Sequence, residues 1–286
     1  MRVGLPDAPR ADGPAPGSRT PADSASEPHP LRVILDFDGT LVEPNVAIVL
    51  VEEFAPDGKR VAHEIDLQLH EGKIGLREAW QRQVAILPVD RIPEMARYVR
   101  DHVPLRQGAH EFLELTRRHR IPVTVVSGGL DFYITEVLHR EGLELPIRSD
   151  RISVDRSGRA AVEHPFGHAT CRICGICKAA VVADPDAGAR SVFIADGSTD
   201  KYGAEVADII FARRRLLDHL RATGVPCYPF EDFRPVTAQF RRWFEEGEPL
   251  PPPRRSGLGT SRCPISRENA TGDLERLLLA LRAARA

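Results

Sequence analysis

Aspartate pairs follow two apolar stretches of this sequence, and their chemistry sets the first question. Asp36 and Asp38 stand in DFDGT, directly after an apolar run. Asp196 and Asp200 stand in ADGSTD, after another such run. An Asp-Gly pair alone is more often a turn than a catalytic site. Carboxylates gathered at one place, however, are costly unless a cation neutralises them, and hard oxygen ligands favour Mg²⁺. These residues therefore predict a magnesium site if the two runs lie side by side.

Phosphate-binding groups follow a third apolar run. Ser127 ends the segment IPVTVVSGG together with Gly128 and Gly129, and Lys178 supplies a cation between this segment and ADGSTD. A hydroxyl, glycine N–H groups and a lysine together can hold a phosphate group. A carboxylate nucleophile, Mg²⁺ and a phosphate cradle describe phosphoryl transfer through an aspartyl-phosphate.

The segment CRICGICK places Cys171, Cys174 and Cys177 directly before Lys178. Thiolates and imidazole suit zinc, so one interpretation is a zinc site completed by His164 or His168. A second is a C-x2-C redox pair, which would need an oxidoreductase fold around it. The third is a set of thiols in a tight loop before a helix. The ligands are crowded compared with those of usual structural zinc sites, and the sequence leaves all three open.

The order of the apolar and amphipathic segments predicts an α/β fold. Strands are expected at the apolar runs 31–35, 121–129, 191–200 and 207–212, because buried parallel strands are short and nearly continuously apolar. Helices are expected over 108–120 and 130–141, and a hairpin over 152–164. The polar ends of the first three strands would meet at the carboxyl edge of the sheet, where ligands of such sheets bind.

Composition divides the chain into five parts. The catalytic core is predicted to comprise residues 30–44 and 105–244, interrupted by a helical cap over 45–104. Residues 1–29, rich in Pro and poor in apolar residues, are expected to be disordered. A Pro/Gly/Arg linker over 245–265 leads to an amphipathic helix over 266–286. That helix is expected to dock on its own core or to fray, and the alternative is a homodimerisation or partner helix.

Bulk properties exclude several classes of partner. The chain has 286 residues and a net charge of −2, so no global basic field points to nucleic acid. No apolar run is long enough to cross a membrane, and the N-terminus lacks a secretory leader pattern. Five cysteines, an odd number, suit a reducing cytoplasm better than a disulfide scaffold. We therefore expect a cytoplasmic protein with neither a nucleic-acid nor a membrane partner.

Taken in order, DFDGT, SGG, the lysine and ADGSTD resemble the four motifs of the haloacid dehalogenase superfamily. The resemblance covers residues from about 31 to 240, and the second aspartate of the first motif marks the phosphatase branch. It implies a Rossmann-like parallel sheet flanked by helices, with an inserted helical cap. One departure is Ala195, where the family usually has Gly. Because alanine is small, we expect the metal geometry to tolerate it.

The resemblance also implies a role for each motif residue. Asp36 would attack phosphorus, and Asp38 would protonate the leaving oxygen and then activate water. Ser127 and the Gly128 N–H would hold phosphate oxygens, while Lys178 would stabilise the charge. The implied ligands of Mg²⁺ are Asp36, the Asp38 carbonyl and Asp196, supported by Asp200.

The helical cap resembles that of the phosphoserine phosphatase group, but two charges expected there are missing. Where those enzymes carry a Glu for the substrate amine, Asn45 stands here, and Gln83 stands near the position of their carboxylate-binding Arg. An amino-acid substrate would therefore lose both ionic partners.

The segments KIGLREAWQRQ, SGGLDFY, CGICK and YPFEDF instead resemble the 2-hydroxy-3-keto-5-methylthiopentenyl-1-phosphate phosphatase family of methionine salvage. This implies a small phosphorylated substrate with an apolar tail, for which Leu76, Trp80 and Phe132 could form a wall. The alternative for Trp80 is cap core. The other functional alternatives are a phosphoserine phosphatase-like enzyme, a secondary-metabolite phosphatase and a non-enzymatic scaffold.

Overall fold

The computed structural model describes residues 30–168, 171, 173–184, 188–252, 254 and 263. The expected disordered segment 1–29 and the expected helix 266–286 lie outside the described residues, as does most of the expected linker 245–265. Within the described part, no helix combines the length and the apolar character that crossing a bilayer requires.

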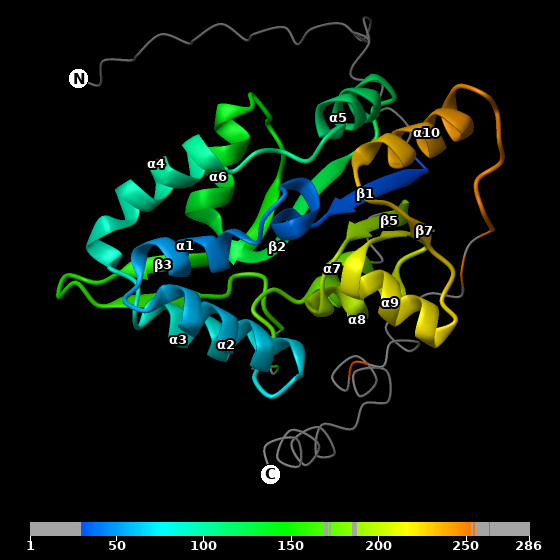
Figure 1. Ribbon diagram of the computed structural model, residues 1–286. Helices are drawn as coiled ribbons and strands as arrows, with labels where there is room; N and C mark the ends of the chain where they lie inside the picture. Colours follow the sequence, from blue (N-terminus) through cyan, green and yellow to red (C-terminus); the bar gives the residue numbers. More distant parts are fainter. Residues whose placement is uncertain are drawn as a thin grey trace, which may run out of the picture.

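A seven-stranded sheet forms the centre of the described chain, in the order β4-β3-β2-β1-β5-β6-β7. Its strands are β1 (Leu31–Leu35), β2 (Val123–Leu130), β3 (Ile147–Val154), β4 (Ala160–Glu163), β5 (Arg190–Ala195), β6 (Ile209–Ala212) and β7 (Tyr228–Pro229). Neighbouring strands are parallel except for the antiparallel hairpin of β3 and β4. The expected strands and the 152–164 hairpin are present, and the predicted α/β class is confirmed (Figure 1).

Alternating side chains of the sheet face two separate apolar layers. Val33 and Leu35 of β1 belong to one buried cluster, whereas Ile34 between them belongs to the other. The same alternation separates Ile194 from Phe193 in β5, as the two-residue period of a strand requires. Burial on both faces explains why these strands read as continuous apolar runs.

Helices cover both faces (Figure 1). The first face is covered by α5 (Ala109–Arg118), α6 (Asp131–Arg140) and α10 (Phe233–Phe244), the second by α7 (Lys178–Val182), α8 (Lys201–Val206) and α9 (Arg214–Thr223). On the first face, the Phe240 ring of α10 packs edge-on against Phe112 of α5, with ring centroids 5.0 Å apart. This aromatic contact ties α10 to α5 although the two helices are far apart in sequence.

Between β1 and β2 the chain leaves the core to form further helices, as expected for an inserted cap. These are α1 (Val46–Phe54), α2 (Gly58–His70), α3 (Leu76–Val84) and α4 (Ile92–His102). Figure 1 shows α1, α2 and α3 grouped beyond the carboxyl end of β1. The α4 helix also packs against α6, and the Arg140 guanidinium donates to the Val103 carbonyl at 2.8 Å. The end of the inserted segment is therefore attached to the core.

The aromatic contact between α5 and α10 yields a test of the fold. Phe240 is fully buried, so Phe240→Ala leaves a cavity and should lower the free energy of unfolding by about 3–5 kcal/mol. Urea unfolding followed by circular dichroism measures the change. Phe166→Ala is the control, because its ring is 39% exposed, and it should cost less than about 1 kcal/mol. Equal costs for the two variants would contradict the described packing.

Candidate active site

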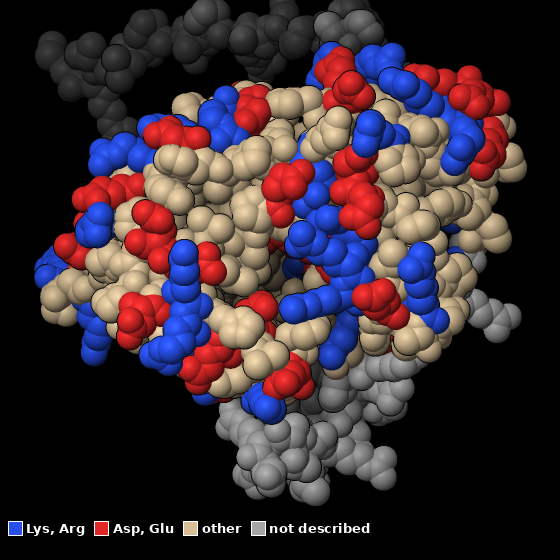
Figure 2. Space-filling model, in the orientation of Figure 1, with Lys and Arg blue, Asp and Glu red and all other residues tan. Residues whose placement is uncertain are grey.

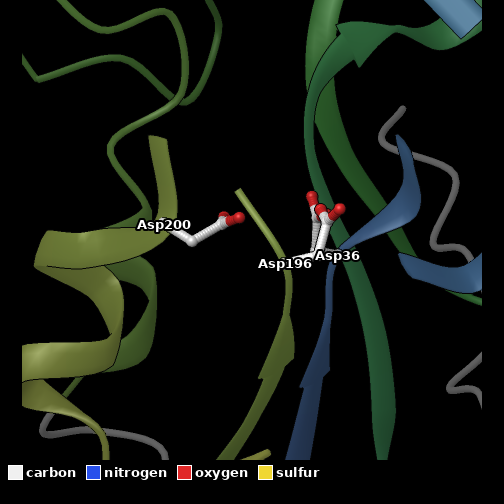
Figure 3. Close-up of side chains that lie close together, drawn as sticks. All are labelled: Asp36, Asp196 and Asp200. Carbon is white, nitrogen blue, oxygen red and sulfur yellow. The ribbon is translucent and has the colours of Figure 1, made fainter. Parts of the chain in front are cut away.

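The predicted meeting of the aspartate pairs follows from strand order. Strands β1 and β5 are adjacent and parallel, with Leu35 opposite Ile194, so Asp36 and Asp196 leave the sheet side by side. Figure 3 shows these two carboxylates together and Asp200 pointing toward them from the segment that begins α8. One oxygen from each of the three lies within 4.8 Å of the others. Ala195 belongs to the second core cluster, so its methyl group packs into the core.

Lys178 is the cation between these carboxylates. Its Nζ lies 2.5 Å from Asp36 Oδ1 and 2.5 Å from Asp200 Oδ1, and its side chain is 6% exposed. Burial alone would lower the pKa of Lys178, but the carboxylates of Asp200 and Asp36 outweigh burial and raise it. The lysine is therefore held as an ammonium. The cysteine-containing segment that precedes it leads directly into α7.

One ammonium does not neutralise the cluster. Burial and the neighbouring Asp200 raise the pKa of Asp36 well above its usual range, even with Lys178 alongside. Burial and Asp200 likewise raise the pKa of Asp196 to about 6, although Arg213 and Arg214 oppose the shift. Carboxylates that repel one another in this way are a suitable donor set for a hard divalent cation. The residues present thus fit Mg²⁺.

Asp38 has different surroundings. Its carboxylate accepts a hydrogen bond from the Val46 N–H at 2.8 Å and one from the Tyr133 hydroxyl at 2.9 Å. Burial raises the pKa of Asp38, and these hydrogen bonds only partly offset the shift. A carboxyl whose pKa is raised retains a proton more readily, as a general acid must. Tyr133 was not predicted as a site residue, although it lies in SGGLDFY, four residues after Gly129.

The predicted phosphate loop lies at the end of β2 and contacts the cap. Ser127 Oγ accepts a hydrogen bond from the Gly129 N–H at 2.9 Å. The Trp80 indole N–H of α3 donates to the Gly128 carbonyl at 2.7 Å. A Cβ at Gly128 would lie 2.5 Å from Leu76 Cδ2, so glycine permits the cap to approach this closely. Trp80 therefore does more than fill the core of the cap, because its indole also donates a hydrogen bond to the phosphate loop.

Two buried arginines hold the turn Phe37–Leu41 that follows the first aspartate. Arg106 Nε donates to the Thr40 carbonyl at 2.8 Å, and Arg213 donates to the Gly39 carbonyl at 2.6 Å. Both side chains are almost fully buried. Neither was predicted from the sequence. The signal available for Arg213 was the run Arg213–Arg215, which directly follows an expected strand and therefore falls at the functional edge of the sheet.

A cavity of about 490 Å³ opens over these groups, between cap and core. Its cap wall is mainly apolar, lined by Ile48, Ile65, Leu69, Leu76, Ala79 and Trp80. Asn45 and Gln83 also line it, and the Asn45 side chain caps α1 by accepting from the Ile48 N–H. Phe132 is not among the lining residues and packs against Tyr133.

Charged side chains stand around the opening of this cavity. Arg214, Arg215, Asp66 and Asp218 contribute to its lining, and Figure 2 shows basic side chains gathered beside the hollow. The Arg215 guanidinium of α9 lies 3.6 Å from the Asp66 carboxylate of α2. An ion pair thus links core and cap at the entrance. These charged residues were not predicted as site residues.

Comparison with known proteins agrees with this geometry. A family model described as haloacid dehalogenase-like hydrolase matches residues 33–205, which is more than half of the chain. The chain belongs to this family. The expected membership, fold and hydrolase class are confirmed.

Two curated proteins and a solved structure resemble most of this chain. A Microcystis aeruginosa protein named 2-hydroxy-3-keto-5-methylthiopentenyl-1-phosphate phosphatase is 29% identical over 202 residues, covering 70% of this chain and 93% of that protein. A protein of the same name from Bacillus cereus (strain G9842) is 26% identical and covers 75% of this chain and 98% of its own length. A substrate-bound phosphoserine phosphatase complex superposes with a TM-score of 0.57 at 20% identity, covering 75% and 99% of the two chains. The structural likeness supports the fold.

The carboxylate cluster predicts a stability change that does not depend on turnover. Mg²⁺ should stabilise the wild type by about 2.7 kcal/mol when present at a hundredfold excess over its dissociation constant. Asp196→Asn removes one repelling charge, so it should raise the melting temperature without Mg²⁺ and abolish the Mg²⁺-dependent rise. Differential scanning calorimetry with and without EDTA measures both effects. The exposed Asp101→Asn should behave as wild type, and an unaltered Mg²⁺ response in Asp196→Asn would contradict the metal assignment.

Proposed function

We propose that the protein is a Mg²⁺-dependent phosphomonoester hydrolase that acts through an aspartyl-phosphate on Asp36. The observation that carries this proposal is the placement of Asp36 beside Lys178, facing a cavity shared with Ser127 and Asp38. A nucleophile, a phosphate loop and an acid with a raised pKa are the groups that such a reaction needs. Each comes from a different strand end or turn of the same sheet edge.

In the first step, a carboxylate oxygen of Asp36 attacks the phosphorus of the bound ester. The bond from phosphorus to the leaving oxygen breaks, and that oxygen takes the proton of Asp38. Ser127 and the Gly128 N–H bind the phosphoryl oxygens as their charge is redistributed, and the Lys178 ammonium lies against the attacking carboxylate. Preorganised donors and cations of this kind lower the barrier because they need not reorient during the reaction.

In the second step, Asp38 is a carboxylate and accepts a proton from water. The water oxygen attacks phosphorus, the bond to Asp36 breaks, and inorganic phosphate leaves with Asp38 protonated again. Tyr133 donates to Asp38 at 2.9 Å and keeps that carboxyl oriented in both steps. Mg²⁺, held by Asp36, the Asp38 carbonyl and Asp196, would supply charge neutralisation at the phosphoryl group.

The cavity supports a substrate with a small apolar end. Apolar cap residues form its wall, and the neutral Gln83 is buried among the lining residues. We therefore propose 2-hydroxy-3-keto-5-methylthiopentenyl-1-phosphate, or a similar phosphorylated metabolite, as substrate. The thioether would lie against Leu76 and Trp80, which line the cavity beside the phosphate loop.

Phosphoserine is the second candidate, because the entrance carries Arg214, Arg215 and Asp66 as well as apolar groups. These charges could pair with the carboxylate and amine of an amino acid. Arg215 and Asp66 already neutralise each other at 3.6 Å, however, so a substrate would have to displace that pair. The ion pair therefore favours a substrate with an uncharged tail over phosphoserine.

The mechanism predicts the effect of removing the nucleophile. Asp36→Asn should lower kcat for p-nitrophenyl phosphate with Mg²⁺ by at least about a thousandfold, because no covalent intermediate can form. Wild type should trap phosphate on Asp36, detectable by mass spectrometry after acid quenching, and the variant should not. Asp101→Asn, which changes an exposed carboxylate on α4 in the same way, should keep full activity. Equal rates for Asp36→Asn and wild type would refute the proposal.

The proposed substrate predicts that kcat/KM differs between the methylthiopentenyl phosphate and phosphoserine. The methylthiopentenyl phosphate should give a kcat/KM at least about tenfold above phosphoserine, because burying one or two methylene-sized groups is worth that much. Leu76→Ser should lower kcat/KM for the thioether substrate more than for p-nitrophenyl phosphate. A preference for phosphoserine would reverse the ranking of the two candidates while leaving the phosphatase reaction in place.

A further inference from the structure

The segment before Lys178 holds three closely spaced thiols outside the proposed catalytic steps. Cys171 is buried, and Cys174 and Cys177 are half-buried. The side chains of Cys171 and Cys174 lie within hydrogen-bonding distance of each other. None of these three forms a disulfide. Such a concentration of sulfur next to an active-site lysine needs an explanation that the phosphatase reaction does not supply.

A fourth cysteine reaches this segment from the far end of the chain. Cys263 is buried and packs in one cluster with Cys171, flanked by the Tyr202 ring of α8. It also lies within electrostatic range of Cys174 and Cys177. Four of the five cysteines of the chain therefore lie in one region of the fold, although Cys263 stands far from the other three in the sequence.

One of the two histidines that could have completed the triad is engaged elsewhere. His164 Nδ1 lies 3.0 Å from the Asp150 carboxylate, which is fully buried. Cys263, which packs directly on Cys171, is the fourth donor that the described residues bring to the triad. The candidate ligands are then four thiols, instead of three thiols and one imidazole.

Four thiolates in one region of the fold are a ligand set for a soft metal centre. Tetrahedral sets of four sulfurs bind zinc or iron–sulfur clusters. The spacing C-x2-C-x2-C, with a distant cysteine followed by Pro264, also matches the pattern that binds one four-iron cluster in bacterial ferredoxins, where three close cysteines are joined by a remote Cys-Pro. We propose that Cys171, Cys174, Cys177 and Cys263 form a four-thiolate metal centre, distinct from the carboxylate site, that takes zinc or an iron–sulfur cluster.

The position of this thiolate centre connects three parts of the molecule. The Arg77 backbone N–H and side-chain Nε donate to the carbonyls of Ile173 and Cys174, at 3.2 and 2.6 Å. Arg77 is the second residue of α3, next to the Leu76 that contacts the phosphate loop. Cys177 immediately precedes Lys178. A metal at this point would fix the cap, the lysine and the segment around Cys263 to one another, so it would act by positioning.

Metal content of the full chain tests the thiolate centre directly. The protein is purified anaerobically without chelator, and zinc, iron and acid-labile sulfide are measured per chain. One zinc, or about four iron with matching sulfide and a broad visible absorbance, supports the proposal and identifies the metal. Absence of both, after reconstitution with zinc and separately with iron and sulfide, overturns it.

Variants assign the ligands. Cys263→Ser and Cys174→Ser should each lose most of the bound metal, whereas Cys227→Ser, which alters the one cysteine outside the cluster, should retain it. Full metal content in Cys263→Ser would overturn the four-thiolate assignment. If the serine variants fail to fold, cobalt(II) titration of wild type decides instead. Intense thiolate-to-cobalt charge-transfer absorbance is expected, and its absence, together with no uptake of iron and sulfide, refutes the centre.

A further readout tests the positioning role and rests on the proposed phosphatase function. Loss of the metal in Cys263→Ser should lower kcat for p-nitrophenyl phosphate, because Lys178 is displaced, while Cys227→Ser keeps wild-type kcat. If wild type itself shows no phosphatase activity, the function fails but the metal measurements still stand. If wild type is active and metal loss leaves kcat unchanged, the positioning role is wrong.

Discussion

The ion pairs of Lys178 hold the site together. The ammonium lies 2.5 Å from carboxylates on two different segments, one after β1 and one at the start of α8. Desolvating three charges is expensive, so removing any one of them leaves the others uncompensated. The lysine thereby fixes the position of α7 relative to the sheet edge. The same interaction leaves a surplus of negative charge, which explains why the arrangement suits an additional divalent cation.

The sequence allowed the strand-end residues to be predicted because strand geometry determines them. Asp36, Ser127 and Asp196 follow buried apolar runs, and parallel strands deliver such residues to one edge. Tyr133 escaped prediction because its contact with Asp38 depends on the rotational phase of α6 relative to β2. Arg106 and Arg213 were not predicted because they donate to backbone carbonyls. Every residue has a backbone carbonyl, so the sequence does not show which ones accept these hydrogen bonds. These are tertiary relations that one sequence does not encode locally.

The cysteines illustrate the same limit for long-range partners. The triad is visible at once from its spacing, but its fourth neighbour is not, because Cys263 follows a Pro/Gly/Arg stretch with no periodic pattern. Only packing against Cys171 and Tyr202 reveals it. The core β-strands, the cap helices, α5 and α6 were predicted from hydrophobic patterns. The helices α7 to α10 were not predicted, and β7, only two residues long, carries too little pattern to be recognised.

The hydrogen bond from Trp80 to the Gly128 carbonyl couples the cap to the loop that would receive phosphate. Two equilibria that share one contact are linked reciprocally. If ligand binding at the loop favours the closed cap by some factor, closure strengthens binding by the same factor. Release of the last product must then disrupt the interaction that helped to capture the substrate. Under that condition the cap and the loop act as one cooperative unit, in which tight retention and rapid exit oppose each other.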